Sequence, residues 1–414
     1  MTQDLQPVRG TKDLIADEAR AYEFIVKKAL TVFETYGFEP IYTPIFEFTE
    51  VFKRSLGDYS DVVNKEMYSF DDRGNESLTL RPEFTAGIAR AYISNGLAHK
   101  SPLRLYSHGP LFRYERPQKG RQRQFHQLNI EALGIASPQM DGEIVQMGAA
   151  MLEALGVLDK TVLNINSLGC SESRASYVEA ITTYFSKYKN DLSDDSKVRL
   201  QKNPLRILDS KDETDIKLGI SAPVIGDYYT EESKRFFGEV LEFLDLTGVK
   251  YNVNPRLVRG LDYYSHTAFE FITTHLGAQG TVLGGGRYDG LISLMGGQQT
   301  PGIGFAAGIE RLALLINEKI TIRPNVIINF LAEKEAIILA KDLRENGICI
   351  INDYDINSAK KMKRANKINA KLAFFIGEDE IKLDIVKIKD LDTGEEIKIP
   401  RSKIVETAKK ILAI

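Results

Sequence analysis

Residues 256–271 read Arg256-Leu-Val-Arg-Gly-Leu-Asp-Tyr-Tyr-Ser-His-Thr-Ala-Phe-Glu-Phe271, and a glycine-rich stretch, Gly284-Gly-Gly-Arg-Tyr-Asp-Gly290, follows them. Arg259 stands in an apolar, strand-like run, where an arginine is costly to desolvate unless an anion pairs with it. Two adjacent tyrosines on a strand point to opposite faces, so we expect only one of Tyr263 and Tyr264 to face a given pocket. The glycines leave room for a ligand to approach the backbone. Together these stretches predict a pocket for an anionic ligand that also carries a polar ring.

The bulk composition is that of an ordinary globular protein. The chain has 414 residues, a length that predicts two to three domains, with 43% hydrophobic and 27% charged residues. The formal net charge is −3, so any nucleic-acid partner must be held by local basic patches rather than by a global field. The sequence contains neither a secretory signal nor a run of 18 apolar residues, which predicts a cytoplasmic protein without a membrane span.

The sequence contains no motif typical of a zinc site or of a redox-active cysteine pair. The two cysteines, Cys170 and Cys349, are far apart, and the five histidines show no zinc-ligand spacing. We therefore expect no protein-bound structural metal. No Walker-type phosphate loop occurs, and no Gly-x-Gly-x-x-Gly motif opens a βαβ unit near the N-terminus, so nucleotide sites of those two kinds are not expected.

The pattern of apolar residues predicts a large first part, an inserted helical module at about 170–245, and a small last domain. In the first part we expect helices at 17–36, 82–95 and 139–155, a hairpin at 66–80, and strands at 103–115 and 124–133. Strand-like sequence returns at 251–283, and a glycine-rich strand at 302–307 leads into an apolar helix at 308–318. After Pro324, strands alternate with helices, which predicts a small α/β domain with a largely parallel sheet.

A basic segment connects the strands at 103–115 and 124–133. It contains one acid, Glu115, and five basic residues, which are Arg113, Arg116, Lys119, Arg121 and Arg123. A flexible loop of this charge can fold over a polyphosphate or contact a nucleic-acid backbone. A solvated hairpin tip is the alternative, but the position of Arg113 between two aromatic residues argues against it.

Polar side chains also share one face of the strand at 124–133. Gln127, Asn129 and Glu131 alternate along it, so they point to the same side. If that side is a pocket, Glu131 can accept a hydrogen bond from a ring nitrogen and Gln127 can bind an ammonium group. A solvent-facing sheet surface stays the alternative. Likewise, Glu83 and Thr85 either cap the helix that follows them or hold a substrate ammonium.

Two further features concern cationic side chains on helices. Arg311 stands in an apolar helix after a glycine-rich segment, where it needs an anionic partner. The predicted helix at 358–371 has no acid and carries Lys360, Lys361, Lys363, Arg364, Lys367 and Lys371. This helix predicts a local phosphate-facing patch, with an ordinary exposed helix face as the alternative.

Taken together, these segments resemble the class II aminoacyl-tRNA synthetases. The strand and basic loop from Phe112 resemble motif 2 of that class, residues 302–311 resemble motif 3, and residues 37–58 look like the weaker motif 1, which builds the dimer interface. The peptides at 259–264 and 284–290, with Val8-Arg-Gly-Thr-Lys-Asp13, are similar to peptides of the histidyl-tRNA synthetases. The resemblance covers essentially the whole chain.

The resemblance implies an α/β (α+β) protein. Residues 1–324 would form a catalytic domain built on a six-stranded antiparallel sheet, and residues 325–414 an α/β anticodon-binding domain. It implies a homodimer that activates histidine with ATP and Mg²⁺ to histidyl-adenylate, with release of pyrophosphate. The histidyl group would then be transferred to the 3′ end of histidine tRNA. A non-aminoacylating paralogue that regulates histidine biosynthesis is the alternative, and a stand-alone tRNA-binding module is another. The intact arginines and the last domain argue against the first, and the pocket side chains against the second.

The resemblance also assigns roles to residues. Arg259 and Arg113 would be catalytic, and ATP would be bound by Arg113, Arg121, Arg259 and Arg311. Histidine would be bound by Glu83, Thr85, Gln127, Glu131, Tyr263, Tyr264 and Tyr288. The tRNA would be contacted by Arg116, Lys119, Arg123, Lys360, Lys361, Lys363 and Arg364.

Overall fold

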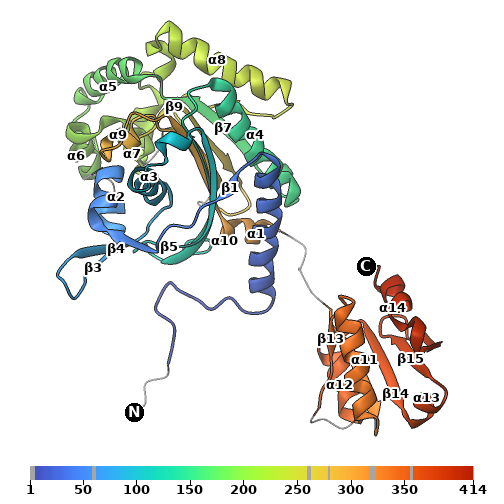
Figure 1. Cartoon of the computed structure of the whole chain (residues 1–414). Helices are drawn as coiled ribbons and strands as arrows, with labels where there is room; N and C mark the ends of the chain where they lie inside the picture. The colour runs from blue at the N-terminus through green and yellow to red at the C-terminus, as the bar shows by residue number, and fades with distance from the viewer. Residues whose placement is uncertain are drawn as a thin grey trace. The chain divides into compact units, whose positions relative to one another are not determined.

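The computed structural model describes residues 5–57, 62–258, 263–277, 280–316, 323–354 and 358–413. The chain divides into two compact units, residues 1–320 and 321–414 (Figure 1). The division falls where the sequence pattern changes to alternating strands and helices. Each unit has a sheet and a hydrophobic core of its own.

A large sheet forms the centre of the first unit, with strand order β1-β5-β6-β11-β10-β9-β7-β8. Its six inner strands are antiparallel: β5 (Leu103–Phe112), β6 (Gln124–Leu133), β11 (Gly302–Gly308), β10 (Thr281–Arg287), β9 (Ser265–Ile272) and β7 (Val162–Ser167). The two-residue strands β1 (Glu39–Pro40) and β8 (Asn252–Val253) extend the edges with parallel pairing. The expected antiparallel sheet is thus confirmed, and two short strands lengthen it.

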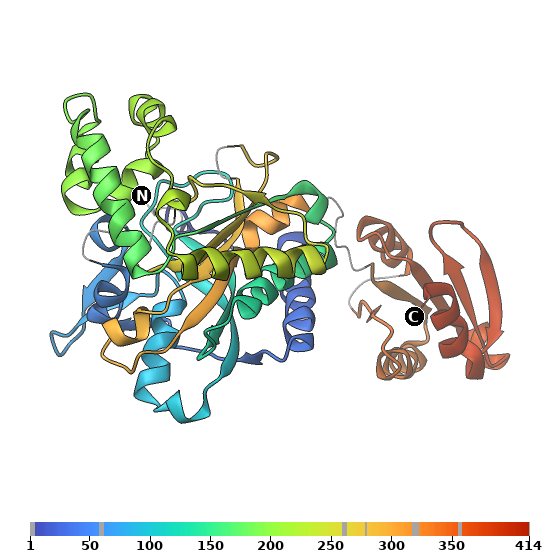
Figure 2. The same ribbon diagram turned by 90° about the horizontal axis from the view of Figure 1, so that it is seen from above.

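Helices cover one face of this sheet (Figures 1 and 2). They are α1 (Asp17–Thr35), α4 (Pro138–Ala154), α8 (Glu231–Leu246) and α10 (Ile309–Leu315). The stripe predicted for the first helix is buried, with Ile25 and Phe33 in the main core. Helix α8 packs on α4 at Gly142, where an added Cβ would lie 2.5 Å from the Phe243 ring. The small residue therefore permits the close approach of these two helices.

Smaller elements lie at the opposite face and at one edge. A three-stranded sheet has the order β2 (Phe46–Phe48), β4 (Ser77–Leu80), β3 (Tyr68–Asp71), which confirms the predicted hairpin. With it lie α2 (Thr49–Leu56), the π-helical turn η1 (Val62–Glu66), α3 (Thr85–Ser94), η2 (Leu97–Lys100) and α9 (Leu291–Leu294). Helix α3 begins at Thr85 rather than at 82, because the Glu83 carboxylate accepts hydrogen bonds from the first amides of the helix.

The stretch at 170–245 is helical, as predicted. After η3 (Leu158–Lys160) and β7, it contains α5 (Ser171–Ser186), α6 (Asp194–Lys202), η4 (Pro204–Asp209), α7 (Glu213–Ile220) and η5 (Ile225–Tyr228). These elements share a core around Tyr177 and Phe185 that also includes Tyr264. Helix α8 differs from them because it packs on α4 and belongs to the main core. The module therefore reaches the main sheet close to the tyrosine pair.

The second unit has a mixed five-stranded sheet. The strand order is β13 (Ile350–Ile351), β12 (Asn325–Phe330), β14 (Leu372–Gly377), β15 (Ile385–Asp390), β16 (Glu396–Pro400), and β12 is parallel to both neighbours. The other two pairs are antiparallel, so the expectation of a largely parallel sheet holds for half of it. The helical elements are α11 (Glu333–Glu345), α12 (Ser358–Lys367), α13 (Glu378–Lys382), η6 (Arg401–Lys403) and α14 (Ile404–Leu412).

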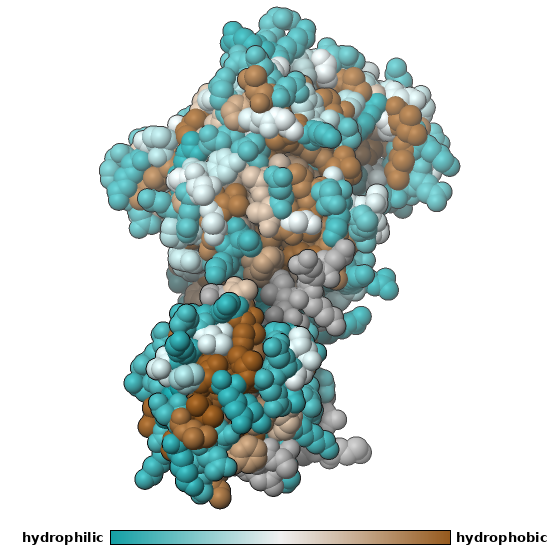
Figure 3. Space-filling model, turned by 90° about the vertical axis from the view of Figure 1, so that its right-hand side faces the viewer, coloured by the Kyte–Doolittle hydropathy of each residue, from teal (hydrophilic) through white to brown (hydrophobic). Residues whose placement is uncertain are grey.

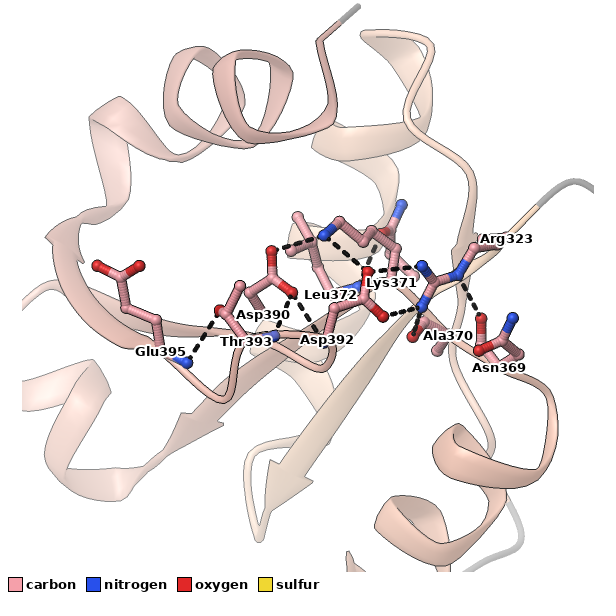
Figure 4. Close-up of polar contacts among 10 residues, drawn as sticks. Arg323, Asn369, Ala370, Lys371, Leu372, Asp390, Asp392, Thr393 and Glu395 are labelled. Atoms are coloured by element: carbon pink, nitrogen blue, oxygen red, sulfur yellow. Dashed lines mark hydrogen bonds and ion pairs between the residues drawn. The ribbon is translucent and has the colours of Figure 1, made fainter.

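A charged network ties the start of the second unit to its β15–β16 turn (Figure 4). Arg323 donates to both carboxylate oxygens of Asp392 at 2.7 Å, and to the carbonyls of Asn369 and Ala370. Lys371 donates to Asp390 at 2.7 Å and to Asp392 at 3.0 Å. The network fixes the point at which the chain enters this unit.

On the face drawn in Figure 3, both units carry hydrophilic side chains interspersed with apolar patches. Among the described residues, no helix combines the length and the apolar character needed to cross a bilayer.

Candidate active site

A cavity of about 440 Å³ opens on the sheet face that α1 and α4 leave uncovered. Alternate residues of β6 face it, since Leu128 and Ile130 point into the main core on the other side. The cavity brings together most of the predicted ligand-binding residues, namely Glu83, Thr85, Arg113, Arg121, Gln127, Glu131, Tyr263, Tyr264, Tyr288 and Arg311. Arg259 lies outside the described residues.

Glu131 is a buried acid of the cavity whose carboxylate is bonded by three side chains. Its carboxylate accepts hydrogen bonds from Thr85 Oγ1 at 2.6 Å, from Asn129 Nδ2 at 3.1 Å, and from the Tyr288 hydroxyl. The residue is 1% exposed, and its burial raises the pKa of this carboxyl to about 7 against the opposing effect of these bonds. A buried carboxylate of this kind is stabilised by a cationic or hydrogen-donating ligand.

Glu83 is the second buried acid. Its oxygens accept the backbone N–H groups of Thr85 and Ala86, each at 2.7 Å, so it caps α3 while it lines the cavity. Burial raises the pKa of Glu83, and the bonds from Ala86 and Thr85 offset part of that rise. The two alternatives considered for this residue are therefore compatible with each other.

Both tyrosines of the adjacent pair line the cavity, so the expectation that only one would do so is wrong. The Tyr263 and Tyr264 ring centroids are 4.7 Å apart, and Tyr263 meets Tyr288 edge-on at 5.7 Å. The physical reason is that β9 begins at Ser265. Side chains alternate between faces only inside a regular strand, and these two residues precede it.

Glycines pack directly against the polar side chains of the cavity, and Gly304 also lines it. A Cβ added at Gly304 would lie 2.1 Å from Oε2 of Glu131, and one at Gly302 would lie 2.3 Å from the Tyr288 ring. A Cβ at Gly286 would meet the Tyr264 ring at 2.9 Å. The glycine-rich stretches thus make room for the polar side chains of the pocket itself.

Guanidinium groups contribute positive charge to the same cavity. Arg113 donates to the Pro82 carbonyl at 2.9 Å and lies over the Phe125 ring. Arg311 donates to the carbonyls of Gly120 at 3.2 Å and Thr281 at 2.6 Å, and burial followed by repulsion from Arg121 lowers its pKa. Backbone carbonyls help to orient these arginines, and the negative charges of Glu115 and Glu310 also act on Arg311. The cavity can therefore take a ligand that carries anionic groups as well as a cation.

The structure adds residues that the sequence did not single out. Glu310 lines the cavity beside Arg311, and its carboxylate accepts the backbone N–H of His126 at 3.0 Å and contacts the His126 ring at 2.8 Å. Arg206 reaches the cavity from the helical module. An acid next to Arg311 in an apolar helix was a signal for Glu310, whereas no local pattern marks Arg206. Among the described residues, no cluster of His, Cys, Asp and Glu is arranged to hold a metal.

The basic residues expected at tRNA lie outside the cavity lining and differ in exposure. Arg116, Lys119, Lys360, Lys363 and Arg364 are exposed, and Arg364 also pairs with Asp353 at 3.2 Å. Arg123 is half-buried, with its guanidinium 3.9 Å over the Tyr114 ring.

Lys361 departs from the expected phosphate-facing row. It is 5% exposed and donates to the side chain of Asn329 on β12, and burial lowers its pKa. Lys361 belongs to the run of basic residues in the sequence. Its position on α12, however, directs its side chain into the domain, towards Asn329 of β12. An exposed contact with phosphate is therefore not expected for this lysine in the structure described.

Comparison with known proteins agrees with this geometry. Residues 10–180 and 230–312 match the family Histidyl-tRNA synthetase, and residues 320–411 match the family Anticodon binding domain. The chain is 52% identical to the histidine–tRNA ligase of Rickettsia bellii over 99% of this chain and 100% of that protein. It is also 52% identical to the histidine–tRNA ligase of Rhodospirillum rubrum over 95% of each chain.

Solved structures give the same result. The apo histidyl-tRNA synthetase of S. aureus superposes with a TM-score of 0.80 at 34% identity, over 97% of this chain and 99% of that one. A Bacillus halodurans protein, titled an ATP phosphoribosyltransferase regulatory subunit/histidyl-tRNA synthetase, shares the fold with a TM-score of 0.68 at 21% identity, over 91% of this chain and 99% of that one. On these matches and on the family model, which covers more than half of the chain, this protein belongs to the histidyl-tRNA synthetase family.

Proposed function

We propose that this chain is a histidine–tRNA ligase. It activates histidine with ATP to form histidyl-adenylate and pyrophosphate, and then transfers the histidyl group to the 3′ end of histidine tRNA. The observation that carries the proposal is a single cavity holding two buried carboxylates, three tyrosines and a set of arginines. Full-length relatives named histidine–tRNA ligase support it.

Histidine recognition would use the bonded acid and the tyrosines. The two imidazole nitrogens differ, one donating and one accepting a hydrogen bond, so a selective site needs both kinds of partner. Glu131 supplies an acceptor, and Tyr264 supplies a hydroxyl that can serve the other nitrogen, with Tyr263 and Tyr288 lining the pocket. The α-ammonium would be held by Glu83, Thr85 and Gln127. A site built on such bonds rejects analogues that lack them.

Adenylation brings the carboxylate of histidine against the α-phosphate of ATP, so two anions must approach each other. Fixed guanidinium groups lower that repulsion and stabilise the charge of the transition state. Arg113, Arg121 and Arg311 line the cavity and suit this role. Arg259, outside the described residues, is proposed to act on the α-phosphate, and loss of one such group commonly costs ~10²–10³ in rate.

ATP would enter as its Mg²⁺ complex. Mg²⁺ is usually bound by one or two carboxylates together with substrate phosphates and water. Glu310 is the described acid beside Arg311 in the cavity and could supply one carboxylate.

The tRNA would be contacted at two places. The second unit would bind the anticodon, with exposed Lys360, Lys363 and Arg364 of α12 as phosphate contacts. The loop with Arg116, Lys119 and Arg123 would meet the acceptor end.

A cytoplasmic location also stays a prediction from the sequence.

A homodimer is proposed through the region of motif 1. Large apolar side chains are exposed there, with Tyr42 at 71%, Phe46 at 52% and Phe48 at 54%. Strand β2 also lies at the edge of its sheet, where further pairing is possible. Large exposed apolar side chains within one short segment are consistent with a protein interface.

The dimer can be tested with Phe48→Glu. Analytical ultracentrifugation of the wild-type chain should give a dimer, and the variant should shift to monomer because a charge is placed in the interface. Leu246→Glu is a matched control, since Leu246 is 80% exposed at the end of α8. A monomeric wild-type chain at micromolar concentration would contradict the proposal.

The central test is ATP–pyrophosphate exchange with each of the twenty amino acids. Exchange should depend on histidine, and charging should occur with histidine tRNA. A regulatory paralogue would instead bind histidine without exchange. No exchange with histidine, or equal exchange with another amino acid, would refute the ligase assignment.

A further inference from the structure

A buried ion pair lies behind the cavity, and neither of its side chains lines the cavity. Arg287 ends β10 and Asp141 belongs to α4, and their side chains are 1% and 0% exposed. Arg287 Nε donates to the two Asp141 oxygens at 3.0 and 3.1 Å, and Nη2 contacts the same carboxylate. An arginine and an aspartate buried this completely need a full set of partners.

The remaining groups of the pair have such partners. Arg287 Nη1 donates to Asp289 at 2.8 Å, and Nη2 donates to the Ile135 carbonyl at 3.1 Å. The second oxygen of Asp141 accepts the Thr267 hydroxyl at 2.5 Å. The pair thus connects α4 with β9 and β10 at one point.

That point is an irregularity in the sheet. Gly286 pairs with Ala268, but the next residue, Arg287, pairs with Ser265, so β9 carries extra residues there. One of them, His266, has a φ of 45°, which is uncommon outside glycine. A bulge bends its strand and changes the direction of nearby side chains. Because Thr267 and Arg287 both bind Asp141, the ion pair holds both sides of this bulge.

The pocket tyrosines flank the bulge directly. Tyr288 follows Arg287 in sequence, and its hydroxyl donates to Glu131. Tyr264 precedes Ser265, and its ring packs against Gly286. The backbone N–H of Asp289 also contacts the Ser265 hydroxyl at 3.4 Å. A shift of Arg287 would therefore move both tyrosines together.

We propose that the Arg287–Asp141 pair is a positioning element for the histidine side of the pocket. It determines where Tyr264 and Tyr288 lie, and through them the affinity for histidine, while the ATP-binding arginines are held by other contacts. This inference rests on the proposed histidine–tRNA ligase function. The competing account is a general structural role, since Phe236 of α8 also packs over Arg287 at 5.6 Å.

The test uses the full-length variants Arg287→Lys and Asp141→Asn. The first keeps the charge but loses the planar fork of donors, and the second keeps the shape but loses the charge. Glu143→Gln is the matched control, because Glu143 lies on the same helix and pairs with Arg104 of β5, with both side chains partly exposed. Circular dichroism and thermal melting establish which variants are folded.

Pyrophosphate exchange is then measured with histidine varied at saturating ATP, and with ATP varied at saturating histidine. In both variants the KM for histidine should rise tenfold or more, while the KM for ATP stays within twofold. The control should keep both values within twofold. This split distinguishes positioning from a general loss of structure, which would affect both substrates.

Three results would overturn the inference: an unchanged KM for histidine in a folded variant, a parallel rise of both KM values, or failure of both variants to fold. If the wild-type chain shows no histidine-dependent exchange, the ligase function fails separately. Calorimetric titration of histidine into the wild-type chain and the variants then decides the inference. Equal affinities, or no binding by any of them, would reject it.

Discussion

At the scale of single residues, the raised pKa of Glu131 couples stability to pH. Its folded-state pKa is about 7, above the ordinary value of 4.5. A carboxyl with a raised pKa favours the fold at low pH, and this contribution is lost as pH rises from about 4.5 through about 7. A shift of this size corresponds to on the order of 3 kcal/mol.

Glu131→Gln should therefore change the pH dependence of stability. The amide that replaces the carboxyl cannot ionise, so the melting temperature of the ligand-free variant relative to wild type should rise between pH 5 and pH 8. Thermal melting at several pH values measures this difference. A difference that does not depend on pH would contradict the shifted pKa, and histidine should bind the variant more weakly at every pH.

Gly304→Ala should damage the pocket without a change of charge. The new methyl group would lie 2.1 Å from Glu131 Oε2 and 2.2 Å from the Ile130 carbonyl, and neither can move without breaking the sheet or the carboxylate contacts. A misplacement of about 1 Å in such a site can cost ~10²-fold in rate, so we expect a loss of that order in histidine kcat/KM. Pyrophosphate exchange measures the loss.

Gly238→Ala is the control for this substitution. Gly238 lies within α8, and an added Cβ there meets nothing within 4 Å. Alanine should leave exchange unchanged and should stabilise the chain by about 0.5–1 kcal/mol through helix propensity. Equal losses in the two variants would contradict the steric account of Gly304.

At the scale of elements, the β15–β16 turn of the second unit depends on a charge network. Contacts with Arg323 and Lys371 lower the pKa of Asp392, and hydrogen bonds, chiefly from Lys371, lower that of Asp390. A depressed carboxyl pKa contributes stability above the ordinary value of 3.8, and the contribution is lost as pH falls below it.

Asp392→Asn should accordingly lower the melting temperature of the second unit at pH 7, and the difference from wild type should begin to narrow only when pH falls below about 3.8. Differential scanning calorimetry follows the effect in the full chain. Glu396→Gln removes an exposed acid on the neighbouring strand and should have a smaller effect, because it pairs only with lysines along the β15–β16 ladder. Equal effects of the two changes would argue against the network.

The accuracy of sequence reasoning also differs from element to element. Helix α1 and the β3–β4 hairpin followed from apolar spacing and turn residues, because those signals are local. The family resemblance predicted that Glu83, Gln127 and Glu131 lie in one pocket. For Gln127 and Glu131, the alternation of side chains along the strand at 124–133 supported the same prediction. The direction of Tyr263 could not be predicted, since it depends on where β9 begins. The burial of Lys361 depends on packing against β12, which no local pattern records.

At the scale of the whole molecule, every described residue of the cavity lies between positions 62 and 311. The second unit, with its own sheet and core, contributes none of them. Removal of residues 323–414 should therefore leave histidine-dependent pyrophosphate exchange within about tenfold of wild type. Transfer to tRNA should fall by at least ~10²-fold, since contacts with the nucleic-acid backbone are lost.

Both activities are measured on the truncated chain after its fold has been checked by circular dichroism. Wild-type tRNA charging by that chain would contradict the anticodon role proposed for the second unit. Loss of both activities in a folded truncated chain would show that the second unit also supports the catalytic one.

The arrangement around Glu131 has a consequence for the speed of ligand capture. Three side chains hold its carboxylate before any ligand arrives, so the entropy of ordering them has already been lost during folding. Histidine should then bind in one fast step, without a slow rearrangement of these groups. In the protein without ligand, the acceptor oxygens of Glu131 are therefore already held in position.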